Sequence, residues 1–146
     1  MEENLKQLLL KDLCARLPYK VKASYYGAEE EMQMYDEVEG VCGDYVEIGQ
    51  YSLPIESVKP YLFPLSSMTQ EQLKDFYDSL EPVLVDAMEE TFRLKDEYKE
   101  LEYRPITVKS VCPEWEAIDF FNKHHLDYNG LIEQSLALDA TNLNIY

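Results

Sequence analysis

The feature that most constrains the fold of this 146-residue chain is a change in the spacing of its apolar residues near position 20. Residues 3–16 place leucines three and four residues apart, the period of a helix with one buried side. From Val21 onward apolar and polar residues alternate, which is the period of a half-buried strand. A chain that changes period in this way is predicted to be α+β. The helical leucines are Leu5, Leu8, Leu9 and Leu13.

Short strands with tight turns follow this first strand. A second strand is expected at about 33–42 and a third at 45–49, with Gly43-Asp44 as the turn between them. Gly49-Gln50 then fits a two-residue hairpin turn before residues 51–53. The pattern predicts a small, bent antiparallel sheet, for which an SH3-like arrangement is one form.

The second half of the chain is predicted to be mostly helical. Thr69 and Gln72 form a capping box at the start of a central helix, and Pro82 either kinks that helix or starts another. Residues 106–111 are β-branched and alternating, so a further strand is expected there. Pro113 then opens the first helix of a C-terminal helical pair, and Asp127 caps the second. The whole is one predicted domain, 1–146, with a sheet-rich part at about 19–62 and a helical part at about 66–146.

The cysteines and the N-terminus indicate a reducing, intracellular setting. Cys14, Cys42 and Cys112 are far apart, odd in number and free of any CxxC spacing, so they are predicted to be reduced and mostly buried. The acidic start Met1–Asn4 lacks the positive charge of a secretory signal. No stretch approaches the roughly 20 apolar residues of a membrane helix. We therefore expect a cytoplasmic protein with no membrane contact and no cofactor.

The formal charge of −16 is the largest compositional signal, and it is uneven. Residues 23–58 contain no Lys or Arg. Because nucleic acids and anionic lipids are bound mainly through Lys and Arg, direct binding to either is not expected. A partner protein with a basic surface is compatible with this charge. Plain solubility is the alternative explanation.

Tyrosines are interleaved with these carboxylates, and tyrosine is enriched at protein interfaces. The alternative is that alternate tyrosines simply pack the small sheet. The predicted interaction residues are Tyr25, Tyr26, Glu29, Glu30, Glu31, Tyr35, Asp36, Glu37, Glu39, Asp44 and Glu47.

The sequence holds few candidates for catalysis. Nucleophile-elbow, phosphate-loop, dinucleotide-binding and HExxH patterns are all missing. His124 and His125 are adjacent, so on a helix they would point about 100° apart and could not both face one ion well. The expectation is therefore histidines at a helix C-terminus, favoured there by the dipole. An enzyme with a site near His125 and Asp127 is the alternative.

Three blocks resemble a group of short uncharacterised proteins of gut-bacterial genomes and their phages or mobile elements. The blocks are Leu8-Leu9-Leu10-Lys11-Asp12-Leu13-Cys14-Ala15-Arg16-Leu17-Pro18-Tyr19, then Ile55-Glu56-Ser57-Val58-Lys59-Pro60-Tyr61-Leu62-Phe63-Pro64-Leu65-Ser66-Ser67-Met68-Thr69, and finally His124-His125-Leu126-Asp127-Tyr128-Asn129-Gly130-Leu131-Ile132-Glu133, which is followed by Leu136-Ala137-Leu138. The resemblance implies a mobile-element setting and no catalytic residue. Relatives carry Arg where this chain has Asn129, so a charged contact made by that Arg would be lost here.

Together these observations predict a non-enzymatic interaction protein that binds and modulates another protein. A more specific form of this hypothesis is a DNA-mimicking inhibitor of a nucleic-acid-binding defence enzyme such as a nuclease. A self-associating structural protein is a further alternative, and the oligomeric state is left open.

Overall fold

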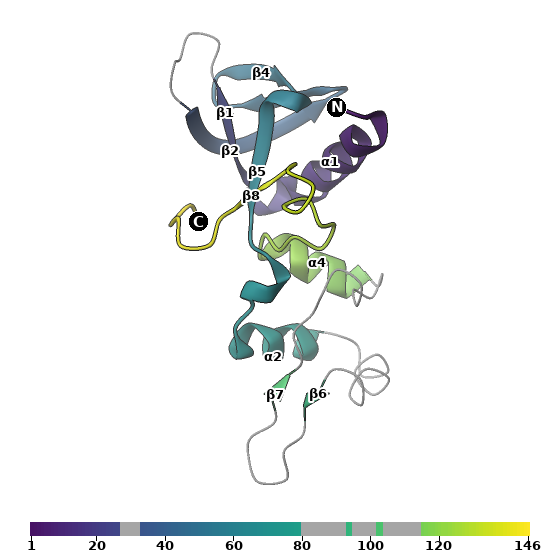
Figure 1. Ribbon diagram of the computed structural model, residues 1–146, viewed down its shortest axis with the longest axis vertical. Coiled ribbons are helices and arrows are strands. Elements are labelled where there is room, and N and C mark those ends of the chain that lie inside the picture. The colour runs from purple at the N-terminus through teal and green to yellow at the C-terminus, as the bar shows by residue number, and fades with distance from the viewer. Residues whose placement is uncertain (27–32, 80–92, 95–101, 104–114) are drawn as a thin grey trace.

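The computed structural model describes residues 1–26, 33–79, 93–94, 102–103 and 115–146 (Figure 1). A helix, α1, comes first, and a sheet follows it at one end of the molecule; α2 and α4 lie at the other end (Figure 1). The prediction of an α+β fold with an N-terminal helix and a small sheet is confirmed. The helices are α1 (Glu3–Arg16), α2 (Gln70–Ser79) and α4 (Trp115–Lys123).

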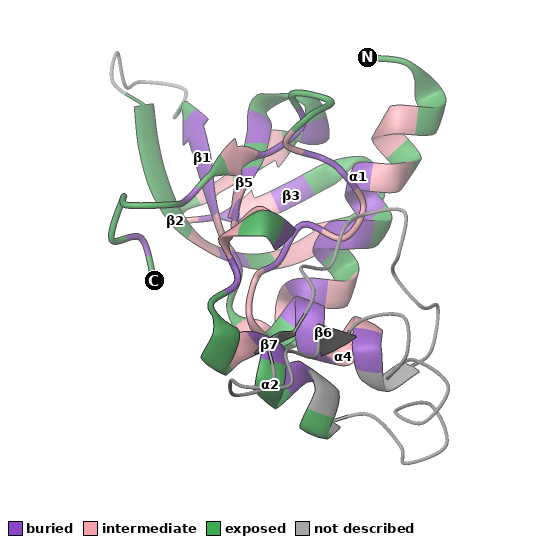
Figure 2. Cartoon of the chain, turned by 60° about the horizontal axis from the view of Figure 1, so that its bottom comes forward, coloured by how far each residue is buried: buried purple, intermediate pink, exposed green. Residues whose placement is uncertain are grey.

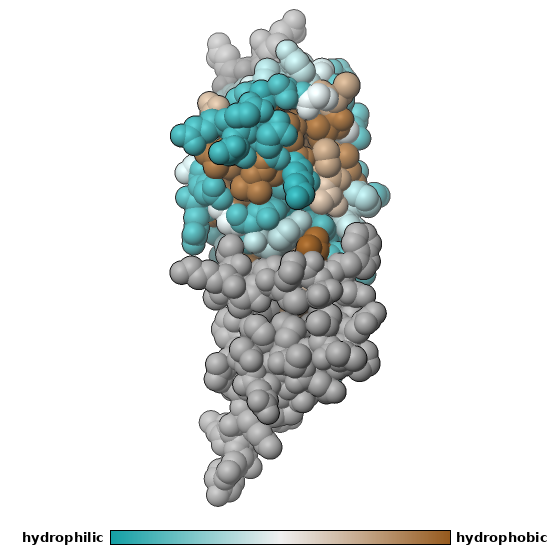
Figure 3. All heavy atoms as spheres, turned by 90° about the vertical axis from the view of Figure 1, so that its right-hand side faces the viewer, coloured by the Kyte–Doolittle hydropathy of each residue, from teal (hydrophilic) through white to brown (hydrophobic). Residues whose placement is uncertain are grey.

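Helix α1 has the predicted bounds. Leu9 and Leu13 are fully buried, and Asp12 and Arg16 lie buried on the same helix. Pro18 lies in a 3₁₀ turn that follows the helix, and Lys20 then adopts a left-handed φ of 59°. Figure 3 shows one side of the molecule, where the described residues include a group of apolar residues surrounded by hydrophilic ones.

The main sheet has six strands in the order β4-β3-β2-β1-β5-β8. All neighbours are antiparallel except β5 and β8, which are parallel. The predicted second strand and both predicted turns are confirmed, whereas the SH3-like arrangement stays a prediction. The strands are β1 (Lys22–Tyr26), β2 (Gln33–Cys42), β3 (Tyr45–Ile48), β4 (Tyr51–Pro54), β5 (Val58–Leu62) and β8 (Leu138–Asp139).

Two hydrophobic clusters form the described core. The larger packs α1 against the inner side of the sheet, where Val46 and Ile48 are fully buried. The smaller joins α2 to α4, with the ring of Phe76 stacked on that of Phe121 at 5.1 Å. Figure 2 shows the difference within the sheet: β1 is largely buried, whereas much of β2 is exposed.

The prediction of a C-terminal helical pair is only half correct. Helix α4 forms, but residues 131–135 are a turn and not a second helix. Ser135 adopts a left-handed φ of 60°, and the amide of Leu136 bonds the carbonyl of Leu131, which is how a helical turn is ended. The chain then continues into β8, whose parallel pairing with β5 the sequence did not predict.

Other expectations fall outside the described residues or are wrong. The kink at Pro82, the strand at 106–111 and Cys112 lie outside them. Arg93–Leu94 forms strand β6, which pairs with β7 (Glu102–Tyr103), and the sequence did not predict either of these short strands. Cys14 and Cys42 were expected to be buried but are exposed. Cys14 follows Leu10 by one turn, at the border of the buried stripe.

Among the helices in the described part of the chain, none is both long and apolar enough to cross a membrane.

Candidate functional site

The side of the sheet that faces away from the larger cluster is rich in exposed tyrosine. Strand residues alternate between the two sides, and residues paired across strands share a side. Ser24 pairs with Tyr35 and with Lys59, and the ring of Tyr35 meets that of Tyr61 edge to face at 6.0 Å. The register therefore defines an outer tyrosine face. Its members are Lys22, Tyr26, Tyr35, Glu37, Tyr45, Glu47, Lys59 and Tyr61.

The tyrosines of this face present much of their side chains to solvent. Tyr26 is 57% exposed, Tyr35 52% and Tyr45 51%. A hollow of about 300 Å³ lies beside Tyr26 and is also lined by Gln33, Glu56 and Lys59. Large amphipathic rings beside a hollow are features of protein-binding surfaces.

Two of the predicted interaction residues lie on the opposite side of the sheet. Tyr25 is 3% exposed and packs its ring 5.9 Å from that of Tyr51, so it belongs to the core. Asp36 pairs with Ala23 and points toward Gly49, where a Cβ atom would lie 3.7 Å from its carboxylate. These positions follow from alternation, because Tyr25 and Tyr26 cannot face the same side of one strand.

The described carboxylates do not all gather on the outer tyrosine face. Asp44 and Glu56 both contact the ammonium of Lys6 on α1, at 2.8 and 3.5 Å. Glu37 lies opposite Lys22 in the strand register. Glu47 accepts a hydrogen bond from the hydroxyl of Ser52 at 2.8 Å.

The remaining predicted acids complete this distribution. Glu39 is exposed at an irregularity in the pairing of β2 with β3. Glu29, Glu30 and Glu31 lie outside the described residues. The outer tyrosine face thus combines aromatic rings with charges of both signs.

A buried ion pair fastens α1 to the segment that follows α4. Arg16 and Asp12 are both fully buried, and two guanidinium nitrogens of Arg16 donate to the carboxylate of Asp12 at 2.6 and 3.1 Å. Arg16 also donates to the carbonyl of Leu126 at 2.7 Å and lies 5.2 Å from the ring centre of Tyr128. Asn129 donates its side-chain amide to Asp12 at 2.8 Å, so this position keeps a polar contact with α1.

The carboxylate of Asp127 is used within the fold. It is 5% exposed and accepts the backbone amides of Leu131 and Ile132 at 2.8 and 2.9 Å. The capping function expected of Asp127 is present, although the turn it caps does not extend into a helix. Both of its oxygens are thus occupied by backbone donors.

His125 stands beyond the end of α4 with a left-handed φ of 57°. Its ring stacks on that of Tyr146 at 3.8 Å, with an angle of 11° between the planes. Burial is the main cause that lowers the pKa of His125 to about 4, and the nearby charge of Arg16 lowers it further. Both histidines directly follow the last residue of α4, so their predicted position at a helix C-terminus is confirmed. Burial also lowers the pKa of His124, so burial opposes the dipole, which would favour the charged form there.

Across the ranges that the structure describes, no three His, Cys, Asp or Glu residues come close enough to hold an ion.

Comparison with protein-family models, with curated proteins and with solved structures finds no match for this chain. The resemblance to short mobile-element proteins therefore stays a prediction.

Proposed function

We propose that this chain is a non-enzymatic protein-interaction module, which binds and modulates another protein through its outer tyrosine face. The observation that carries the proposal is the exposure of Tyr26 and Tyr35, each more than half exposed, on a sheet whose other side is packed. An aromatic face that buries little in the isolated chain has area available for a partner.

The partner that fits this face carries a basic surface. The net charge of −16 attracts a cationic protein over long range and speeds its association. At contact, Arg and Lys side chains pack well over tyrosine rings, and Glu37 and Glu47 lie among those rings. Phage or mobile-element origin is part of this proposal and rests on the resemblance of the three sequence blocks.

The geometry gives the general interaction function more support than the DNA-mimic form. A mimic needs carboxylates arranged along one continuous surface. The described carboxylates are instead divided, with Asp36 on the inner side of the sheet and Asp44 paired with Lys6.

Site-specific photocrosslinking in the native host tests this proposal. A photoreactive phenylalanine analogue replaces Tyr35 in the full chain, and a matched chain carries it at Leu143, which is similarly exposed at 51% but lies outside the outer tyrosine face. We expect a specific protein to be captured from position 35 and not from position 143.

Purified partner and chain then allow the face to be tested directly. The double variant Tyr26→Ala/Tyr35→Ala should weaken binding at least tenfold, and binding of the unaltered chain should weaken as salt rises. Equal capture from both positions, or unchanged affinity of the double variant, would reject the proposal.

A further inference from the structure

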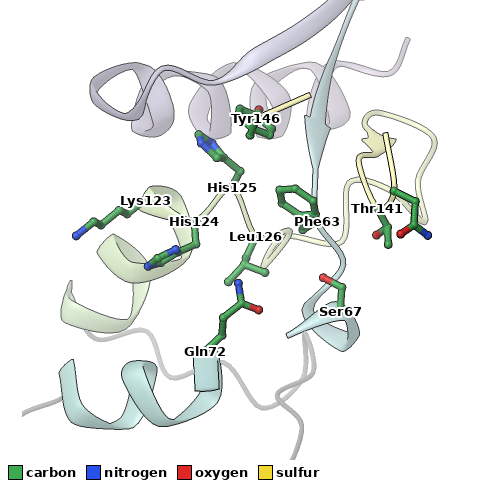
Figure 4. A pocket seen from close by; sticks show the side chains of 10 residues that line it. Phe63, Ser67, Gln72, Lys123, His124, His125, Leu126, Thr141 and Tyr146 are labelled. Carbon is green, nitrogen blue, oxygen red and sulfur yellow. The ribbon is translucent and has the colours of Figure 1, made fainter. Parts of the chain in front are cut away.

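A second hollow lies between the start of α2, the end of α4 and the C-terminal segment (Figure 4). Its volume is about 370 Å³, within the range of small-molecule sites in proteins. None of the residues that line this hollow belongs to the outer tyrosine face, although Tyr146 in its wall hydrogen-bonds Lys22 and Tyr61 of that face.

One wall of this pocket is apolar and aromatic. Phe63, Leu126 and Tyr146 contribute it, and the rings of Phe63 and Tyr146 lie 5.9 Å apart. The ring of Tyr146 is held in place, because His125 stacks on it and its hydroxyl donates to the carbonyl of Tyr61 at 2.8 Å. A fixed aromatic wall suits a flat ring, which can stack or pack edge to face without ordering new side chains.

The rest of the lining is polar and can both donate and accept hydrogen bonds. Gln72, His124 and Asn142 carry amide or imidazole groups of this kind. The carbonyl oxygen of Gln72 already accepts the backbone amide of Thr69 at 3.0 Å, which leaves its NH₂ group to donate. Figure 4 shows the Gln72 side chain reaching toward Leu126.

The pocket offers little charge to a bound molecule. Its described lining includes no carboxylate side chain, and the ammonium end of Lys123 points away from the other lining groups (Figure 4). Burial lowers the pKa of His124, although Asp75 opposes this, and it lowers the pKa of His125 to about 4, so both imidazoles are neutral at pH 7. A charged ligand would lose hydration here without gaining a counter-charge.

We propose that this pocket binds an uncharged, flat heteroaromatic compound with both hydrogen-bond donors and acceptors, of the size of a nucleobase or nucleoside. The aromatic wall takes the face of the ring, and the amide and imidazole groups bind its polar edge.

Adenosine is the probe that tests this assignment. The full chain is titrated with it at pH 7 while the ring signals of His124 and Tyr146 are followed by NMR. We expect saturable shifts with a dissociation constant in the range of about 1 mM or tighter. Benzoate, which is flat but charged, and cyclohexanol, which is not flat, should each bind at least tenfold more weakly.

Three variants locate the binding. Thr141→Trp fills the pocket and should weaken adenosine binding at least tenfold; Leu143→Trp, two residues on and outside the lining, should leave it within twofold. Asn142→Gly offers a second check that avoids bulk, since the φ of 64° at Asn142 suits glycine, and it should weaken binding several-fold.

Three results would each overturn the assignment: no saturable shift with adenosine, benzoate binding as tightly as adenosine, or full affinity in a folded Thr141→Trp or Asn142→Gly chain. The backbone NMR spectrum of each variant reports whether it is folded.

Discussion

At the scale of single residues, Arg16 is the side chain whose loss should cost most. Arg16→Met would leave the carboxylate of Asp12 fully buried without its cation. Removing one partner of a buried ion pair typically costs about 3–5 kcal/mol. We expect a loss of that order in the free energy of unfolding, measured by urea denaturation.

Two comparisons separate the ion pair from other effects of this substitution. Lys11→Met, at an exposed position of the same helix, should change stability by less than about 0.5 kcal/mol. Adding Asp12→Leu to Arg16→Met removes the orphaned charge and should recover much of the loss. If Arg16→Met alone were as stable as the parent chain, the ion pair would not be what holds α1 to the segment after α4.

His125 gives the molecule a specific pH dependence. The native state keeps this imidazole neutral down to its pKa of about 4, whereas in the unfolded chain it takes up a proton near its ordinary value of 6.5. Acidification from pH 7 to pH 5 therefore favours the unfolded chain, and stability is lost as the pH falls through this window. The part due to His125 should be about 1–2 kcal/mol.

Comparison with His125→Gln isolates this contribution from that of the many carboxylates. Urea denaturation at pH 7 and pH 5 should show a smaller loss on acidification for the variant than for the parent chain. Parallel curves, or an NMR titration of His125 with its midpoint near pH 6.5, would contradict the prediction.

At the scale of elements, the sequence predicted best what local chemistry determines. The capping box of α2 is an example: Thr69 and Gln72 exchange hydrogen bonds of 3.0 and 3.2 Å, as their spacing indicated. The bounds of α1 and β2 were equally accessible, because the period of their apolar residues does not depend on distant contacts.

Elements that depend on distant contacts were missed. Strand β8 has only two residues, and it exists because it pairs with β5, more than 70 residues earlier in the chain. The apolar spacing of Leu131, Ile132 and Leu136 imitates a helix, yet the left-handed Ser135 ends the turn after one cycle. No local pattern distinguishes these outcomes.

The candidate site was predictable in part for the same reason. Alternation alone places Tyr25 and Tyr26 on opposite sides of β1, so the sequence already indicated that these two neighbours could not share one binding face. Bringing Tyr35 next to Tyr61 requires the register of β1 with both β2 and β5, which the sequence does not contain.

The two hairpin turns of the sheet should respond differently to the same substitution. Gly43 and Gly49 both have a φ of 59°, which disfavours any residue with a Cβ atom. At Gly43 an added Cβ meets nothing within 4 Å, whereas at Gly49 it would lie 2.6 Å from the hydroxyl of Tyr25. We expect Gly43→Ala to cost about 1 kcal/mol and Gly49→Ala about 2–3 kcal/mol.

Thermal and urea denaturation of the two variants measure this difference. Tyr25→Phe combined with Gly49→Ala removes the clashing hydroxyl, so the extra cost should shrink toward that of Gly43→Ala. Equal costs at the two turns would show that the ring of Tyr25 moves freely, contrary to its burial in the core.

At the scale of the whole molecule, the net charge contributes to stability through repulsion among all charged residues. With 29 acidic and 13 basic side chains, the folded chain repels itself, and added salt screens that repulsion. Salt also weakens the contacts of Lys6 with Asp44 and Glu56, but surface pairs such as these, whose carboxylates are exposed, are worth only about 0–1 kcal/mol. Screening of the overall repulsion should have a larger effect than weakening of the ion pairs. The melting temperature at pH 7 should therefore rise by a few degrees between 20 and 300 mM NaCl.

Lys6→Gln provides the matched variant for this last prediction. It removes one cation from beside two carboxylates and takes the formal charge from −16 to −17, because one lysine is lost. Screening then has more repulsion to relieve and no ion pair to weaken at that place, so the rise with NaCl should be larger than in the parent chain. A melting temperature that falls with salt in the parent, or a smaller rise in the variant, would mean that local pairs and not overall repulsion govern the response to salt.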